Sequence, residues 1–240
     1  AVTTGAQNTV IGSAAGDAIT TANNNVLVGE QAGTEITTGS GNTAIGRSAL
    51  AVSTTAALNT AVGYISLGAN TSGEDNTAVG AYSLDANTTG SDNTAIGDNA
   101  LGANTTAGTN TAIGSSAMAA NTTGASNVSV GANSLDANTT GNYNTGIGKS
   151  SLGANTTGGN NTGIGFSALA ATTTVAGLTA VGYQALAANT TGESNVAVGL
   201  NAGAALTTGG YNTAIGTEAL LTAITASSNT ALGREALKAN

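Results

Sequence analysis

Hydrophobic and polar residues follow a pattern that repeats every 17 residues along the chain. Each repeat begins with Asn-Thr-Ala-Ile-Gly or a close variant, as at residues 93–97 and 110–114. The glycine that closes this stretch recurs, with no insertion or deletion, at Gly12, Gly29, Gly46, Gly63, Gly80, Gly97, Gly114, Gly131, Gly148, Gly165, Gly182, Gly199, Gly216 and Gly233. Because stacked coils lose their register when one of them changes length, this strict period predicts a solenoid.

Positions 2 and 4 of the repeat carry its β-branched and aliphatic residues. Numbered from its first Asn, the repeat has the consensus N-T-A-[IV]-G-x-x-[AS]-L-x-A-N-T-T-G-x-x. Two residues that are two apart share one face of a strand. We therefore expect positions 2 and 4, such as Thr94 and Ile96, to be buried. The small residue at position 3 should then point outward.

A large aliphatic residue moves between positions 9 and 12. Position 9 is Leu or Met in eleven coils and Gly in three, and in those three coils position 12 becomes aliphatic: Gly16 with Ile19, Gly33 with Ile36, and Gly203 with Leu206. Since cores tolerate substitutions that conserve volume, both positions are expected to reach one apolar space. That space lies either inside the coil or at a packed interface.

Charged and aromatic residues keep to a few positions of the repeat. All charged residues except Glu35 occupy positions 6, 7, 10, 16 and 17, and all six aromatic residues occupy positions 6, 7 and 17. These positions are predicted to form exposed corners. The Gly of position 5 is predicted to make a tight turn that needs a positive φ.

The pattern as a whole predicts an all-β protein, a parallel β-solenoid (β-roll) of fourteen 17-residue coils with two or three short strands per turn. The Asn of position 1 should form a ladder of stacked side-chain amides, broken only at Leu178. The array covers residues 1–240 as one domain without a linker. Neither end carries a polar cap, as expected of a fragment or of a unit that stacks end to end.

Composition limits the chemistry that the chain can perform. It has no Cys and no His, only 7% charged residues, and a net charge of −8. No residues form a candidate nucleophile, base or paired acid, so we expect no enzymatic activity and no cofactor. The negative charge disfavours nucleic-acid binding. No apolar run is long enough to span a membrane.

Three groups of residues are candidate sites. Asp75 and Asp92 share position 17 in adjacent coils and are candidate metal ligands, with solvated surface charge as the alternative. Exposed aromatic residues occur at binding surfaces, so Tyr64, Tyr82, Phe166 and Tyr183 are candidates for receptor contact, with ordinary surface aromatic residues as the alternative. Sequons at position 12 are candidate glycosylation sites, with turn and ladder residues as the alternative: Asn70, Asn87, Asn104, Asn121, Asn138, Asn155 and Asn189.

The stretch TAVGYQALAANTTGESNVAVG, residues 179–199, resembles the NTAVGYQAL repeats of phage tail fibres and related surface fibres. The motif Asn-Thr-Ala-Ile-Gly is also similar to the Ser-Val-Ala-Ile-Gly motif in the heads of trimeric autotransporter adhesins. The resemblance covers the whole chain, although the adhesin coil is about three residues shorter. It implies a homotrimer with left-handed coils, located outside the cell on a virion tail or a cell surface.

Three functions follow from these observations. The first is a structural or adhesive shaft or head segment of a trimeric fibre that presents a receptor-binding end to a glycan or protein on a cell. The second is the repeating subunit of an extracellular filament. The third is an ice-binding solenoid, because Thr fills positions 13 and 14 in nearly every coil. Adjacent residues of a strand point to opposite faces, however, so a Thr-Thr pair would supply only one Thr column.

Overall fold

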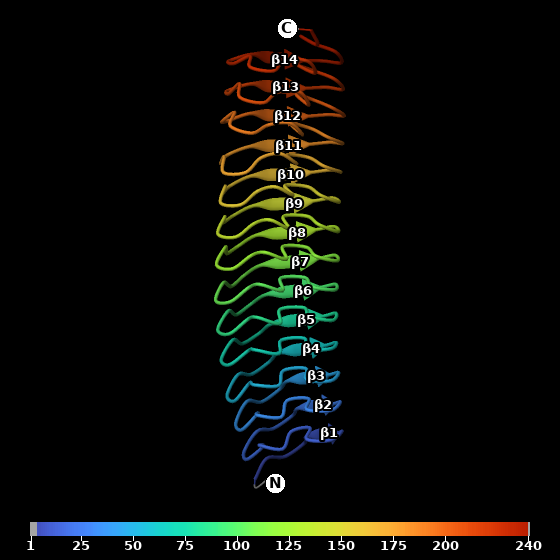
Figure 1. The fold of residues 1–240 in the computed structure, drawn as a ribbon, viewed down its shortest axis with the longest axis vertical. Helices are drawn as coiled ribbons and strands as arrows, with labels where there is room; N and C mark the ends of the chain where they lie inside the picture. The colour runs from blue at the N-terminus through green and yellow to red at the C-terminus, as the bar shows by residue number, and fades with distance from the viewer. Residues whose placement is uncertain (1–3, 240) are drawn as a thin grey trace. The chain divides into compact units, whose positions relative to one another are not determined.

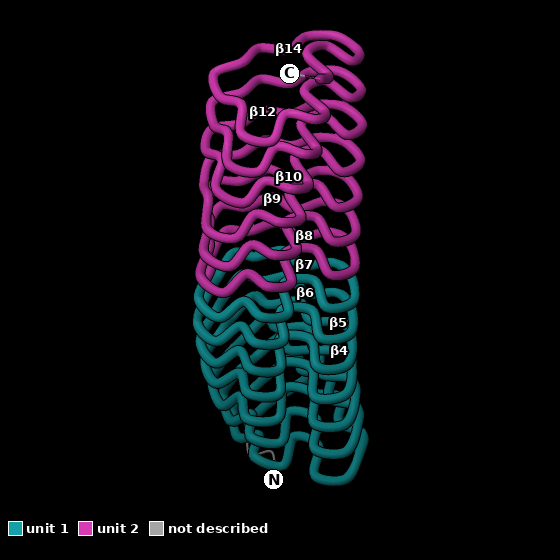
Figure 2. Tube along the Cα trace, turned by 45° about the horizontal axis from the view of Figure 1, so that its top comes forward, with its two compact units in different colours: residues 1–123 teal, residues 124–240 magenta. Residues whose placement is uncertain are grey.

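The computed structural model describes residues 4–239, so the two ends of the predicted array, residues 1–3 and 240, lie outside the described part. The chain divides into two compact units, residues 1–123 and residues 124–240, which Figure 2 shows in different colours. Each unit is a parallel β-solenoid with one coil per 17-residue repeat and no helix among its described residues. The predicted fold class is confirmed.

Unit 1 contributes one strand from each of its coils to a parallel sheet, and the strands follow one another in sequence order (Figure 1). Each residue pairs with the equivalent residue of the next coil, as Thr94 pairs with Thr111. The strands are β1 (Thr9–Ile11), β2 (Val26–Val28), β3 (Thr43–Ile45), β4 (Thr60–Val62), β5 (Thr77–Val79), β6 (Thr94–Ile96) and β7 (Thr111–Ile113).

Unit 2 repeats this arrangement with seven further strands in the same parallel register. The strands are β8 (Val128–Val130), β9 (Thr145–Ile147), β10 (Thr162–Ile164), β11 (Thr179–Val181), β12 (Val196–Val198), β13 (Thr213–Ile215) and β14 (Thr230–Leu232).

Each coil has a single strand of three residues, so the expectation of two or three strands per turn is wrong. Outside the strand the backbone turns repeatedly through left-handed conformations at positions 7, 9 and 17, as at Leu101 with a φ of 51°. Hydrogen bonds between coils nevertheless continue through these turns. The amide of Leu101 donates to the carbonyl of Ala117 in the next coil at 3.0 Å. Coils are therefore held together around their circumference, although only positions 2–4 form a regular ladder.

The Gly of position 5 is required by two constraints. Its φ lies far into the positive region, at 136° for Gly97, where residues with a side chain are strained. A Cβ atom at Gly97 would also lie only 2.5 Å from the carbonyl oxygen of Gly114, the equivalent residue of the next coil. Successive coils approach so closely at this turn that no side chain fits.

The interior of each coil is lined by positions 1, 3, 8, 9, 12 and 15. Leu101 at position 9 and Ala95 at position 3 are both completely buried. The prediction for the strand is therefore inverted: position 3 points inward, while Ile96 and Ile113 at position 4 are each 38% exposed. Thr94 at position 2 is half-buried.

The inversion follows from the narrowness of the coil. Position 3 faces positions 8 and 9 of the preceding coil, because a Cβ on Gly146 would lie 2.7 Å from Ser134 Oγ and 3.2 Å from Leu135 Cδ1. One Leu per coil already occupies this space, so only a small residue fits opposite it. Two β-branched side chains from positions 2 and 4 would overfill the interior, and they lie outside instead.

The expectation that positions 9 and 12 share one space is confirmed in the two N-terminal coils. A Cβ on Gly16 would lie 2.9 Å from Ile19 Cδ1, and a Cβ on Gly33 would lie 2.8 Å from Ile36 Cδ1. Leu206 is also buried, but the nearest atoms to Gly203 belong to Leu186 of the preceding coil. The shared space lies inside the coil and not at an interface.

Two ladders of Asn side chains occupy the rest of the interior. At position 1, Asn93 Nδ2 donates to Asn76 Oδ1 at 3.1 Å, and the predicted ladder is confirmed. At position 12, Asn104 Nδ2 donates to Asn87 Oδ1 at 2.9 Å, which forms a second ladder. Both ladders donate to the carbonyl of position 15, as Asn93 and Asn104 do to Ala107. Most buried side-chain amides are therefore paired within and between coils, with Asn155 Oδ1 and both polar atoms of Asn189 as exceptions.

Candidate functional surface

The sheet presents an outward face of Thr and aliphatic side chains in each unit, formed by positions 2 and 4 of the strands. We call it the Thr–Ile face. Away from the terminal coils its exposed aliphatic residues include Ile45, Ile96 and Ile113 in unit 1, and Ile147, Val198 and Ile215 in unit 2. Positions 2 and 4 carry no charged residue in any coil. The face is thus an uncharged surface on which the same two side-chain types recur about every 4.8 Å.

The Thr side chains of this face leave their hydroxyl groups open to solvent. Among the described residues, no hydrogen bond to the protein is formed by the hydroxyls of Thr94, Thr111 or Thr162. Each hydroxyl lies two residues along the strand from an aliphatic side chain on the same face. The face therefore combines a column of hydroxyls, interrupted at Val26, Val128 and Val196, with a parallel column of methyl groups.

The Thr-Thr pair of positions 13 and 14 lies in a bend outside the strands, where both residues reach the surface. At position 13 the hydroxyl is bound, as Thr88 Oγ1 donates to the carbonyl of Thr105 at 3.0 Å. At position 14, Thr89 and Thr106 are exposed. The expectation of one Thr column assumed an extended strand, and these residues do not lie in one.

The four aromatic candidates form two pairs on exposed corners. The rings of Tyr64 and Tyr82 meet edge to face with centroids 5.2 Å apart. The rings of Phe166 and Tyr183 stack with centroids 5.3 Å apart and planes inclined by 12°. All four side chains are exposed, as the sequence predicts.

The Tyr64 pair belongs to a small polar cluster. Arg47 forms an ion pair with Glu30 at 3.3 Å, donates to the Tyr64 hydroxyl at 3.2 Å, and lies 5.7 Å from the Tyr64 ring centroid. The pKa of Tyr82 is raised, mainly by desolvation and secondly by the electrostatic effect of the neighbouring Tyr64. The cluster joins four consecutive coils, three through residues of position 6 and the fourth through Tyr82 at position 7.

Asp75 and Asp92 are both exposed at position 17 of adjacent coils. Within residues 4–239, no three or more His, Cys, Asp or Glu side chains gather in a way that could hold a metal ion. The structure thus places the two candidate ligands in neighbouring coils without a third.

The sequon asparagines lie inside the coils. Asn70, Asn87 and Asn104 are completely inaccessible, as are the four other sequon residues, Asn121, Asn138, Asn155 and Asn189. An enzyme cannot reach these amides in the folded protein, so the glycosylation hypothesis is wrong for the folded chain. For six of them the alternative assignment as ladder residues is the one that the structure bears out, whereas the side-chain amide of Asn189 has no partner.

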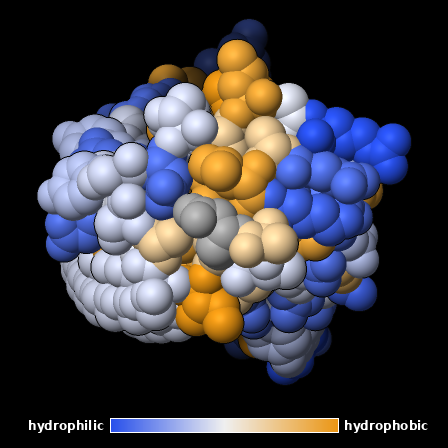
Figure 3. Space-filling view, turned by 90° about the horizontal axis from the view of Figure 1, so that it is seen from above, coloured by the Kyte–Doolittle hydropathy of each residue, from blue (hydrophilic) through white to orange (hydrophobic). Residues whose placement is uncertain are grey.

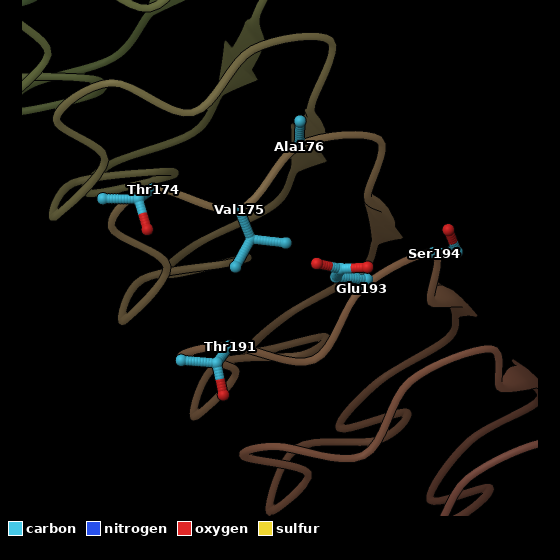
Figure 4. A pocket seen from close by; sticks show the side chains of 6 residues that line it. All are labelled: Thr174, Val175, Ala176, Thr191, Glu193 and Ser194. Carbon is cyan, nitrogen blue, oxygen red and sulfur yellow. The ribbon is translucent and has the colours of Figure 1, made fainter.

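A cavity of about 570 Å³ opens between two corners of unit 2. It is lined by Thr174, Val175, Ala176, Thr191, Glu193 and Ser194, and Figure 4 shows the Glu193 carboxylate pointing toward Val175. The consensus pattern of the repeat does not predict this cavity. The signal that could have indicated it is the loss of the consensus Asn at both Thr172 and Leu178.

Hydropathy varies around the surface of the protein. In the end view of Figure 3, pale, near-neutral side chains repeat in a column at the lower left, while the blue hydrophilic residues gather mainly on the right.

The described residues include no helix that is long and apolar enough to cross a membrane. No protein-family model, curated protein or solved structure matches the chain.

Proposed function

We propose that the chain is a structural segment of an extracellular homotrimeric fibre, of the kind found on phage tails or microbial surfaces. The observation that carries this proposal is the Thr–Ile face. Soluble monomers rarely expose long uncharged stripes of aliphatic side chains, and such surfaces mark sites of association.

A second copy of the chain is the partner that fits this face best. Its own Thr–Ile face repeats with the same period, so each coil can meet an equivalent coil at the same level. Partners of a different period would fall out of step after a few coils. The number of copies, three, comes from the resemblance of the repeat to trimeric fibres and adhesin heads.

The interior suits a segment that bears load and resists proteases. Backbone hydrogen bonds, two Asn ladders and a Leu stack link each coil to the next. A nick in one coil would leave its neighbours paired, because each repeat of a solenoid contacts mainly the adjacent repeats.

Receptor contact is assigned to the corners, which stay exposed beside an interface on the Thr–Ile face. Tyr64 with Tyr82 and Phe166 with Tyr183 offer aromatic surface there, with Arg47 as a polar neighbour. A cell-surface glycan or protein is the proposed partner class.

Native mass measurement tests the proposal. The wild-type chain should show the mass of three chains. The double variant Ile96→Lys with Ile113→Lys should shift to single chains, because it places two charges on the proposed interface. A matched variant, Thr89→Lys with Thr106→Lys, adds the same charge at exposed position 14 and should keep the wild-type mass. A wild-type chain that stays monomeric at high concentration would overturn the fibre proposal.

Ice binding is the second candidate, favoured by the two outward columns of the Thr–Ile face. Free hydroxyls beside methyl groups at a fixed spacing can order water on a flat surface. This use requires the face to be open, so it predicts a monomer. Thermal hysteresis of the wild-type chain that is lost in Ile96→Lys with Ile113→Lys but retained in Thr89→Lys with Thr106→Lys would support it. A trimer without thermal hysteresis would exclude it.

A further inference from the structure

Unit 2 contains one level at which two successive coils are joined far less than elsewhere. At this level a gap separates residues 172–178 of one coil from residues 189–195 of the next. The cavity of about 570 Å³ lies between them, since its lining comes from residues 174–176 and 191–194.

An intact level of the same unit shows what is missing. Between residues 138–144 and 155–161, the carbonyl of Thr156 accepts three hydrogen bonds from the preceding coil, from the Thr139 amide at 2.8 Å, the Thr140 amide at 3.3 Å and Thr139 Oγ1 at 3.0 Å. Three further bonds come from the Asn ladders: Asn155 to Asn138, the amide of Asn161 to Asn144, and Asn144 to the carbonyl of Gly158.

None of these six bonds has a counterpart at the gap among the described residues. The amides of Thr173 and Thr174 do not reach Thr190 as their equivalents reach Thr156. The side chain of Leu178 has no amide group, so it can neither accept from the backbone amide of Asn195 nor donate to the carbonyl of Gly192. What remains on this side is one bond, from Thr172 Oγ1 to the carbonyl of Asn189 at 3.1 Å.

Three departures from the consensus lie on one edge of the gap. Thr172 and Leu178 replace the two ladder asparagines, and Val175 replaces the small residue of position 15. At this level Nδ2 of the buried Asn189 is left without a partner, because Thr172 has no amide oxygen to accept from it. Unpaired buried polar groups destabilise the folded state, so this level loses stability in two ways.

The far side of the same level stays intact. Strands β11 and β12 pair in full register, and the Thr179 amide donates to the carbonyl of Asn195 at 3.0 Å. The two coils are therefore joined along the strand and parted at the opposite corner.

We infer that unit 2 contains a built-in opening point, at which residues 172–178 separate from residues 189–195 before any other pair of neighbouring coils in the unit parts. The strand acts as the hinge, and the cavity is the start of the opening. Local opening is governed by the bonds that must break, and six of them are already absent here.

Hydrogen exchange with residue-level resolution tests the inference. The amides of Asn189 and Asn155 donate the same bond within their own coils, to Leu186 at 3.1 Å and to Leu152 at 3.0 Å. The Asn189 amide should exchange at least about tenfold faster than the Asn155 amide, because each lost hydrogen bond lowers the opening cost. Equal protection of the two amides would overturn the inference.

Two variants test the cause in opposite directions. The triple variant Thr172→Asn, Val175→Gly and Leu178→Asn restores the consensus and should protect Asn189 to the level of Asn155. The mirror variant Asn138→Thr, Gly141→Val and Asn144→Leu should move the fast exchange to Asn155. If neither variant changes exchange at its own level, the ladder substitutions do not cause the opening. Oligomeric state does not affect this comparison, because the Asn ladders lie inside each coil.

Discussion

Leu101 shows how little space a single residue has inside these coils. Its side chain is completely buried, and every other residue that lines the interior is Ala, Ser, Gly or Asn in the consensus. The aliphatic core thus amounts to one large side chain per coil, stacked on the equivalent residue of the next.

Leu101→Ala is expected to lower the free energy of unfolding by about 2–5 kcal/mol, the range for removing a buried Leu side chain. Asp98→Ala, at an exposed position of the same coil, should change it by less than about 0.5 kcal/mol. Urea unfolding followed by circular dichroism measures both values. Similar effects of the two substitutions would contradict the assignment of position 9 to the interior.

Asp85 has an environment that penalises its charged form. Burial raises the pKa of the Asp85 carboxyl, against the lowering effect of hydrogen bonds from the amides of Asp85 and Ala86. A folded-state pKa above the unfolded value means that the ionised carboxylate destabilises the fold. The penalty is fully present at neutral pH and disappears as pH falls below the unfolded pKa.

Asp85→Asn should therefore stabilise the protein at pH 7, by less than about 1 kcal/mol because the side chain is partly exposed. At a pH of about 3, below the unfolded pKa of an Asp, the variant and the wild type should unfold alike. Urea unfolding at the two pH values tests this. A variant that is less stable than the wild type at pH 7 would show that the two amide hydrogen bonds outweigh burial.

At the scale of the element, the three-residue strand could be located from the sequence but not oriented. The period of two groups Thr94 with Ile96 correctly, but the pair lies on the opposite side of the strand from the one predicted. Large aliphatic residues are expected in a core and small ones at the surface, whereas the narrow interior admits only the small residue of position 3. The covariation that reveals the true side was present, because Val10 and Leu27 enlarge position 3 only where Gly16 and Gly33 empty position 9.

The Asn ladders join elements that the strands alone would hold weakly. Asn93 donates to Asn76 and to the carbonyl of Ala107, and its Oδ1 accepts from the amide of Asn110 at 3.0 Å. Asn93→Ala is expected to cost about 2–3 kcal/mol, because it leaves buried partners unpaired. Thr106→Ala, at exposed position 14, serves as the control and should stay within about 0.5 kcal/mol.

Neighbours in a ladder should also depend on each other. Combining Asn76→Ala with Asn93→Ala should cost less than the sum of the single substitutions, with a coupling of roughly 0.5–3 kcal/mol. The free energies of unfolding of the four proteins in this cycle measure the coupling. Strict additivity would mean that the side-chain bonds between coils contribute nothing.

At the scale of the whole molecule, the solenoid, its repeat length and its exposed corners could be predicted from the sequence, and the exposed Thr–Ile face could not. The corners were indicated directly by Tyr64, Phe166 and the charged residues, since such side chains cannot enter so narrow an interior. The Thr–Ile face was missed because its exposure depends on the width of the closed coil. That width is a property of the complete turn and not of a three-residue strand.

Deleting a whole coil should leave the fold stable, whereas a deletion that is not a multiple of 17 residues should not. Deleting residues 77–93 joins Asn76 to Thr94 and preserves every position of the repeat, so the shortened chain should fold with nearly unchanged thermal stability. Deleting residues 78–93, one residue fewer, shifts the register and should strongly lower the thermal midpoint. Circular dichroism compares the two. Equal midpoints would show that the coils do not depend on a fixed register.

The burial of the position 12 asparagines has a consequence for where this protein can be made. Before the chain folds, Asn87, Asn104 and their equivalents are ordinary accessible sequons. A eukaryotic secretory pathway attaches sugars to such sites on the nascent polypeptide, and a glycan on Asn104 could not enter a space that holds only an amide. The native fold is therefore compatible with synthesis in cells or compartments that leave the newly made chain unglycosylated.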